Sequence, residues 1–157
     1  MSSLDELRAV RLKKLAALRA RGINPYPITA HPDMTLAEAQ AKFASLAKKK
    51  SLTLAGRVVG MRSQGALIFF DLADGTGRFQ CLIKKDDAPE TFALWRDIVD
   101  VGDFVEAAGV LFKTKTGEKT LAVASWRMLA KALRPLPEKH EGLQDTEERF
   151  RKRYLDI

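Results

Sequence analysis

The chain has 157 residues and is 46% hydrophobic, enough to bury the core of one domain with flanking segments. It has no run of about 18 apolar residues and no secretory signal, which excludes a membrane span and export. Its one cysteine, Cys81, allows no internal disulfide, so we expect a cytoplasmic protein. The formal net charge of +7 is concentrated in residues 1–51, at +6, and this favours a polyanionic partner.

Residues 4–21 are predicted to form the first helix, because they lack Pro and Gly and are rich in Ala, Leu, Lys and Arg. Its apolar stripe is interrupted by Arg11 and consists of Leu4, Leu7, Leu15 and Leu18. We therefore expect a loosely docked helix that presents Arg8, Lys13 and Lys14 to a phosphate backbone. An ordinary basic, solvated helix is the alternative.

A second helix is predicted over residues 36–46, since residues 35–38 form the capping box TLAE. From residue 52 the pattern changes to strands, which we place at 52–62, 66–72, 78–84, 103–113 and 118–130. Residues 89–99 have helical spacing. Five strands with a helix between the third and fourth predict an OB-fold, a mainly β barrel with flanking helices, in preference to another small five-stranded barrel.

Three segments follow from this assignment. Residues 1–51 form a basic helical extension, residues 52–133 form the barrel, and residues 134–157 lead away from it. Glycines inside the predicted strands, at positions 56, 60 and 109, are typical of the bulges and corners that a barrel needs.

The second and third strands carry the candidate binding surface. In the second strand Ile68 and Phe70 share one face, and Phe69 lies on the other. In the third strand Cys81 faces inward as a small hydrophobic residue, while Gln80 faces outward. An aromatic ring can stack on an unstacked base and an amide can read its edge, so this pair suits RNA binding. An exposed Phe and a solvated Gln without function are the alternative.

Oligonucleotides lie across strands 2 and 3 of an OB-fold, between the loop joining strands 1 and 2 and the loop joining strands 4 and 5. We place Arg62 at the first loop, and Lys113, Lys115 and Glu118 at the second. These residues converge with Phe69 and Gln80 on one predicted surface, which favours RNA binding over the alternative.

Catalytic chemistry is not indicated by these residues. The histidines, His31 and His140, lie far apart and without metal-ligand spacing, so we expect no metal site. Asp71 and Asp74 lack a base or metal partner, and we interpret them as structural. No phosphate-binding loop of the GxxxxGK type occurs.

The sequence resembles the anticodon-binding region of class II lysyl-tRNA synthetases over nearly its whole length. The matching segments are KKL at 13–15, GI at 22–23, AGR at 55–57, FKTKTGE at 112–118, KALRPLP at 131–137, GL at 142–143 and RYLD at 153–156. The related aspartyl and asparaginyl enzymes lack the KALRPLP-like segment, whereas RYLD is shared by all three.

This resemblance implies roles for individual residues. Phe69 would stack on the middle anticodon base, a uridine, and Gln80 and Arg62 would form hydrogen bonds with it. Glu118 would help to read a neighbouring base. The family often has a second Arg beside position 62, and Met61 stands there in this chain.

The resemblance also implies a lysine–tRNA ligase that uses ATP and magnesium in a catalytic domain absent here, so we expect these 157 residues to bind tRNA, hold no cofactor and be inactive alone. It implies a homodimer for the full-length enzyme and allows a monomer for this stretch. The second function class is a stand-alone OB module for single-stranded nucleic acid.

Overall fold

The computed structural model describes residues 3–48, 51–136, 146–151 and 153. Its strands are β1 (Leu52–Gln64), β2 (Leu67–Ala73), β3 (Arg78–Lys84), β4 (Phe104–Lys113) and β5 (Lys119–Ala130). Its helices are α1 (Leu4–Ala20), α2 (Leu36–Ala41), α3 (Phe43–Leu46), α4 (Pro89–Ile98) and α5 (Thr146–Arg151). The parts of the predicted C-terminal segment at 137–145 and 154–157, with His140, lie outside the described residues.

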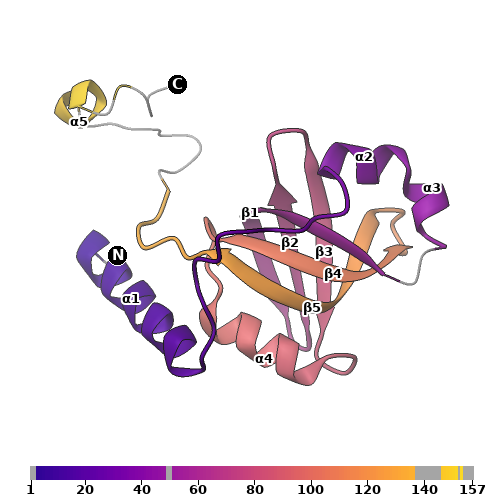
Figure 1. Cartoon of the computed structure of the whole chain (residues 1–157), viewed down its shortest axis with the longest axis horizontal. Coiled ribbons are helices and arrows are strands. Elements are labelled where there is room, and N and C mark those ends of the chain that lie inside the picture. The colour runs from indigo at the N-terminus through magenta and orange to yellow at the C-terminus, as the bar shows by residue number, and fades with distance from the viewer. Residues whose placement is uncertain (1–2, 49–50, 137–145, 152, 154–157) are drawn as a thin grey trace.

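The five strands close into a barrel in the order β1–β2–β3–β5–β4. All neighbouring pairs are antiparallel except β3 and β5, which run parallel. Figure 1 shows α1 beside α4 at one end of the barrel, and α2 and α3 at the other end. The predicted OB-fold is confirmed, and the strand boundaries agree with the predictions to within two residues. No helix in the described parts of the chain is long and apolar enough to cross a membrane.

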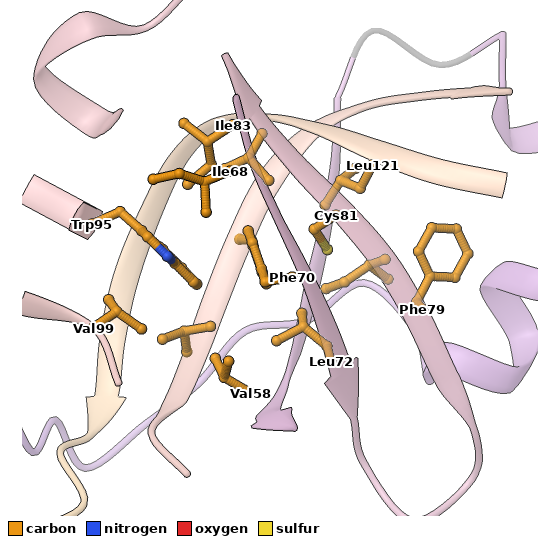
Figure 2. Close-up of a cluster of buried hydrophobic side chains, with 14 of the residues drawn as sticks. Val58, Ile68, Phe70, Leu72, Phe79, Cys81, Ile83, Trp95, Val99 and Leu121 are labelled. Atoms are coloured by element: carbon orange, nitrogen blue, oxygen red, sulfur yellow. The ribbon is translucent and has the colours of Figure 1, made fainter. Parts of the chain in front are cut away.

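Strict alternation along β2 builds the barrel core. Ile68, Phe70 and Leu72 are at most 1% exposed, while the residues between them are partly exposed. The Phe70 ring stacks on Trp95 of α4 with their centroids 4.0 Å apart, so α4 closes one end of the barrel (Figure 2). Cys81 lies inward beside them and is fully buried, and this burial raises the pKa of its thiol. The prediction that it acts as a small core residue is confirmed.

Gly109 is required by the close approach of β4 and β5. A Cβ at this position would lie 1.9 Å from the carbonyl oxygen of Ala122, which no side chain can tolerate. The register of the two strands also shifts between Ala108 and Gly109. The predicted corner at this glycine is therefore confirmed, and it lets the sheet curve into a closed barrel.

The apolar stripe predicted for α1 is only half correct. Leu15 and Leu18 are buried, but Leu4 is 71% exposed and Leu7 is 37% exposed. Arg11, which interrupts the stripe, also docks the helix. Its guanidinium donates hydrogen bonds to the backbone oxygens of Val101, Ala132 and Arg134, at distances from 3.2 to 3.4 Å.

A cluster of buried charges holds the same end of the barrel together. Lys131 and Asp103 are both inaccessible in their side chains and form an ion pair of 2.7 Å. Lys131 also contacts Asp100 at 2.8 Å, and Asp100 in turn pairs with Lys14 of α1 at 2.7 Å. Burial raises the pKa of Asp100, but the hydrogen bonds and positive charges of Lys131 and Lys14 outweigh it, so the pKa lies below its ordinary value. Helix α1 is thus fixed by polar contacts in addition to its buried leucines, and the predicted loose docking is wrong.

The helix predicted over 36–46 is interrupted at Lys42, where the backbone leaves helical geometry (φ −99°, ψ 16°). Its start is capped twice. The Thr35 hydroxyl accepts from the Glu38 N–H, as predicted, and the Asp74 carboxylate of the β2–β3 turn accepts from the Leu36 N–H at 2.9 Å. Asp74 also accepts from Thr76, and these bonds outweigh burial and hold the pKa of its carboxyl below the ordinary value. The structural interpretation of Asp74 agrees with this arrangement.

Candidate nucleic-acid interface

A pocket of about 140 Å³ opens on the outer face of β1, β2 and β3. It is lined by Gly60, Met61, Arg62, Phe69, Phe70, Asp71 and Gln80. Three of the predicted binding residues, Arg62, Phe69 and Gln80, therefore meet at one site. Phe70 connects the floor of this site to the packed core.

A β-bulge places Arg62 on this face. The pairing of β1 with β2 shifts between Val58 and Gly60, where one strand has an extra residue. Without that residue Arg62 would follow the inward parity of Val58, but after the bulge it lies directly opposite Phe69. Arg62 is thus within β1 and not in the loop between strands 1 and 2, which corrects its predicted location.

Phe69 is half-buried and lies across from Leu82 of β3. The guanidinium carbon of Arg62 is 4.9 Å from the centroid of the Phe69 ring, so the cation covers one face of the ring. A cation–π contact at a surface site contributes about 0.5–1 kcal/mol, which is less than a stacked base contributes. The Arg62 guanidinium therefore holds the ring in place, and a stacked base can replace it there.

Gln80 is oriented by a hydrogen bond. Its Nε2 donates to the hydroxyl of Thr120 on the parallel strand β5, at 2.9 Å. Among the described residues, no protein group donates to its Oε1. The amide therefore keeps a carbonyl acceptor available at the pocket.

The hairpin between β4 and β5 carries the other three predicted residues of the barrel. Lys113 ends β4, Lys115 lies in the turn, and Glu118 immediately precedes β5; all three are exposed. The turn is closed by reciprocal bonds between Thr114 and Glu118, in which each backbone N–H donates to the other residue. The Lys113 ammonium lies 5.9 Å from the ring of Phe43 in α3, so the helical extension flanks this hairpin.

The three basic residues predicted on α1 lie apart from the pocket. Arg8 and Lys13 are exposed, whereas the ammonium of Lys14 is engaged with Asp100. The packing partners of α1 are α4 and the residues near Asp100 and Ala132, none of which lines the pocket. The helix therefore provides a second positive surface rather than part of the pocket.

Two site contacts escaped prediction, and so did the effect on Arg62 of the bulge that Gly60 had indicated. The sulfur of Met61 accepts a hydrogen bond from the Trp95 indole at 3.1 Å. This contact holds Met61 against α4, so only one arginine, Arg62, lies at this part of the pocket. Thr120 orients Gln80, and the bulge re-aims Arg62. Gly60 was a signal for the bulge, but the bond between Thr120 and Gln80 joins residues 40 positions apart and leaves no local pattern.

Comparison with known sequences defines the class of protein domain. Residues 52–129 match the family described as OB-fold nucleic acid binding domain, of the tRNA anticodon type. This match covers the barrel from the start of β1 almost to the end of β5. The barrel belongs to that family of nucleic-acid-binding domains.

Similar sequences over the whole chain narrow this class to one kind of enzyme. The chain is 44% identical to a lysine–tRNA ligase of Dehalococcoides mccartyi over 159 residues, 48% to that of Chloroflexus aurantiacus over 157, and 41% to that of Thermotoga maritima over 160. Each alignment covers 98% of this chain and 32% of the relative, so the chain spans about a third of their length. The chain is homologous to the N-terminal region of lysyl-tRNA synthetases, which confirms the resemblance and supports it over a stand-alone module.

Proposed function

We propose that this chain is the anticodon-binding part of a lysine–tRNA ligase and that its pocket reads a tRNA with a middle uridine. The observation that best supports this proposal is that Phe69 and Gln80 line one pocket on the outer face of the barrel, with the Gln80 amide oriented by a hydrogen bond. The ring supplies a stacking surface and the amide supplies a directional acceptor. Together they provide both affinity for a base and a choice between bases.

Stacking involves an exchange at Phe69. A base that enters from the covered face displaces the Arg62 guanidinium from the ring, at a loss of about 0.5–1 kcal/mol, and gains about 1–3 kcal/mol from stacking. The exchange is therefore favourable. The released guanidinium, which has no hydrogen-bond acceptor among the described residues, can then donate to a base carbonyl.

Base choice follows from the fixed amide. Uracil presents an N–H between two carbonyl oxygens, whereas cytosine presents a bare ring nitrogen beside an amino group. The Gln80 Oε1 accepts the uracil N–H, and Arg62 complements a carbonyl oxygen. Cytosine would place its ring lone pair against Oε1 and leave polar groups unpaired, which costs about 1–3 kcal/mol.

The remaining predicted residues have different parts in the proposal. Lys113, Lys115, Arg8 and Lys13 contact phosphates, which adds affinity without base choice. Lys14 acts mainly through Asp100 and adds its charge to the same surface. Glu118, on the hairpin beside the pocket, helps to read a neighbouring anticodon base.

The division of the full enzyme is also part of the proposal. Residues 1–51 form the helical extension, 52–133 the anticodon-binding barrel and 134–157 the connection to a catalytic domain, where ATP and magnesium act and a homodimer forms. Among the described residues, no group of three or more His, Cys, Asp or Glu side chains is placed to hold a metal ion. We expect no charging of tRNA when this chain is supplied with lysine, ATP and tRNA.

The test uses two anticodon stem-loops that differ only in a middle uridine or cytidine. Titration of the wild-type chain should favour uridine, and Gln80→Ala should reduce that preference while retaining binding. Gln40→Ala is the matched control, because Gln40 donates its amide to the Arg78 backbone outside the pocket. Equal affinity of the wild type for both stem-loops and for an unstructured oligonucleotide would instead support a general single-strand-binding module.

A further inference from the structure

Thr120 is a polar residue with no solvent exposure on the outer row of the barrel face. It pairs with Gln80 across the parallel β3–β5 ladder and with Phe112 across the antiparallel β4–β5 ladder. A fully buried hydroxyl is retained only where its hydrogen bonds are satisfied. The contacts of this hydroxyl therefore indicate what it does.

The hydroxyl has one hydrogen and two lone pairs. Its hydrogen is donated to the backbone oxygen of Glu118 at 3.2 Å, which leaves only lone pairs for Gln80. The nitrogen end of the Gln80 amide, and not its oxygen end, must then face Thr120, at 2.9 Å. The identity of the residue at 120 thus determines which end of the amide faces the pocket.

The Glu118 backbone oxygen, which accepts the hydrogen of the Thr120 hydroxyl, is itself fixed. The Glu118 oxygen also accepts from the Thr114 N–H at 3.0 Å, and the Glu118 N–H donates to the Thr114 hydroxyl at 3.1 Å. This closed turn prevents the carbonyl from rotating away. The Thr120 hydroxyl consequently has a defined direction, which it imposes on Gln80.

We propose that Thr120 is a positioning residue that sets pyrimidine choice at the pocket by locking the Gln80 amide with its oxygen toward the base. This inference rests on the proposed function of Gln80. Without the hydroxyl, the amide can turn over and offer its NH₂ group to the ring nitrogen of cytosine. Thr120 would then determine specificity without touching RNA.

Thr120→Val is nearly the same shape as the native residue and lacks the hydroxyl. It should reduce the ratio of uridine to cytidine affinity by at least about fivefold, toward the value of Gln80→Ala, chiefly by improving cytidine binding. Thr120→Ser keeps the hydroxyl and should retain the wild-type ratio. Thr91→Val is the matched control, since the Thr91 hydroxyl also donates to a backbone oxygen but lies outside the pocket.

Melting curves of each variant establish folding, and Thr120→Ala replaces the valine variant if valine disturbs the barrel. A hydroxyl-free, folded variant with an unchanged base ratio would overturn the inference, even if Gln80→Ala loses the preference as proposed. A wild type without any uridine preference would overturn the proposed function and this inference together. A loss of affinity for both bases without a change in ratio would likewise overturn it, because Thr120 would then support the pocket without setting base choice.

Discussion

Two regions of this molecule, the charge cluster beside α1 and the pocket face of the barrel, use charged residues in opposite ways. Lys131, Asp103, Asp100 and Lys14 form a connected set of ion pairs, and the side chains of Lys131 and Asp103 are inaccessible to solvent. On the pocket face, Arg62, Lys113 and Lys115 form no ion pair within the described residues. The first set holds the helix and the barrel together, and the second set remains available for a ligand.

The difference teaches that residue type and local density of charge do not determine function. Lys13 and Lys14 are neighbours in the sequence, yet Lys13 is exposed and Lys14 contacts Asp100 at 2.7 Å. A buried pair has already lost its water and is sensitive to the loss of either member, whereas an exposed cation is free to replace counterions on RNA. Stability and binding should therefore respond to different substitutions.

The largest effect is expected at the buried pair. Asp103→Ala should lower the free energy of unfolding by about 3–5 kcal/mol, because it leaves the Lys131 ammonium without its closest partner and removes acceptors for two backbone N–H groups. Denaturant titration measures this loss. Asp97→Ala breaks an exposed pair with Arg96 and should change stability by no more than about 1 kcal/mol. Equal effects of the two variants would contradict the contrast.

The next effect concerns binding. Phe69→Ala should weaken stem-loop binding by about 1–3 kcal/mol with either middle pyrimidine, since every base has a face that stacks. Phe104→Ala is a matched control, because Phe104 is also an outward phenylalanine covered by a guanidinium, that of Arg57, at 4.5 Å. Isothermal titration should show little change for the control. A similar loss from both variants would mean that the pocket has no special part in binding.

Acid should weaken the polar end through Asp100. Its pKa is depressed in the folded protein, so its contribution is complete above the unfolded value of about 3.8 and is lost as pH falls through the lower folded pKa. Unfolding free energies of wild type and Asp100→Asn should differ at pH 7 and converge as pH falls through the lowered folded pKa of Asp100. Asp74 and Glu106 also have depressed pKa values and remain in both proteins, so they cancel in this difference. A difference that grows on acidification would contradict the assignment.

The smallest effects are expected from the two neighbouring lysines. Lys13→Ala should leave stability unchanged, weaken all stem-loops alike and reduce the slope of log affinity against log salt by about 1. Lys14→Ala should lower stability by roughly 1 kcal/mol through the partly buried pair with Asp100. Paired salt titrations and melting curves separate the two outcomes. A change in base preference from Lys13→Ala would contradict a role confined to phosphates.

Local pattern was sufficient to predict the barrel. Alternation in β2 and β3 is a pattern between residues two positions apart, so it can be read directly from the sequence. Glycines inside strands are visible in the sequence too, although the strand contact that requires Gly109 is not. The same alternation identified Phe69 and Gln80 as outward residues, and the structure brings them to one pocket. These elements were predictable because each depends on short-range periodicity.

The remaining features depend on contacts between distant segments. Arg11 interrupts the apolar stripe of α1, and its acceptor at Ala132 is 121 residues away. Asp74 caps a helix that begins 38 residues before it. No periodicity in the sequence reports such pairs, so the polar docking of α1 and the capping of α2 became visible only in the folded chain.

The central claim is that RNA occupies the pocket face and leaves the buried charge cluster unchanged. Amide ¹H–¹⁵N spectra of the wild-type chain, recorded with and without a stem-loop that has a middle uridine, test it directly. The largest shift changes should fall on Phe69, Gln80 and Thr120, with little change at Asp103 and Lys131. Changes concentrated at Asp103 and Lys131, with a silent pocket, would contradict the account.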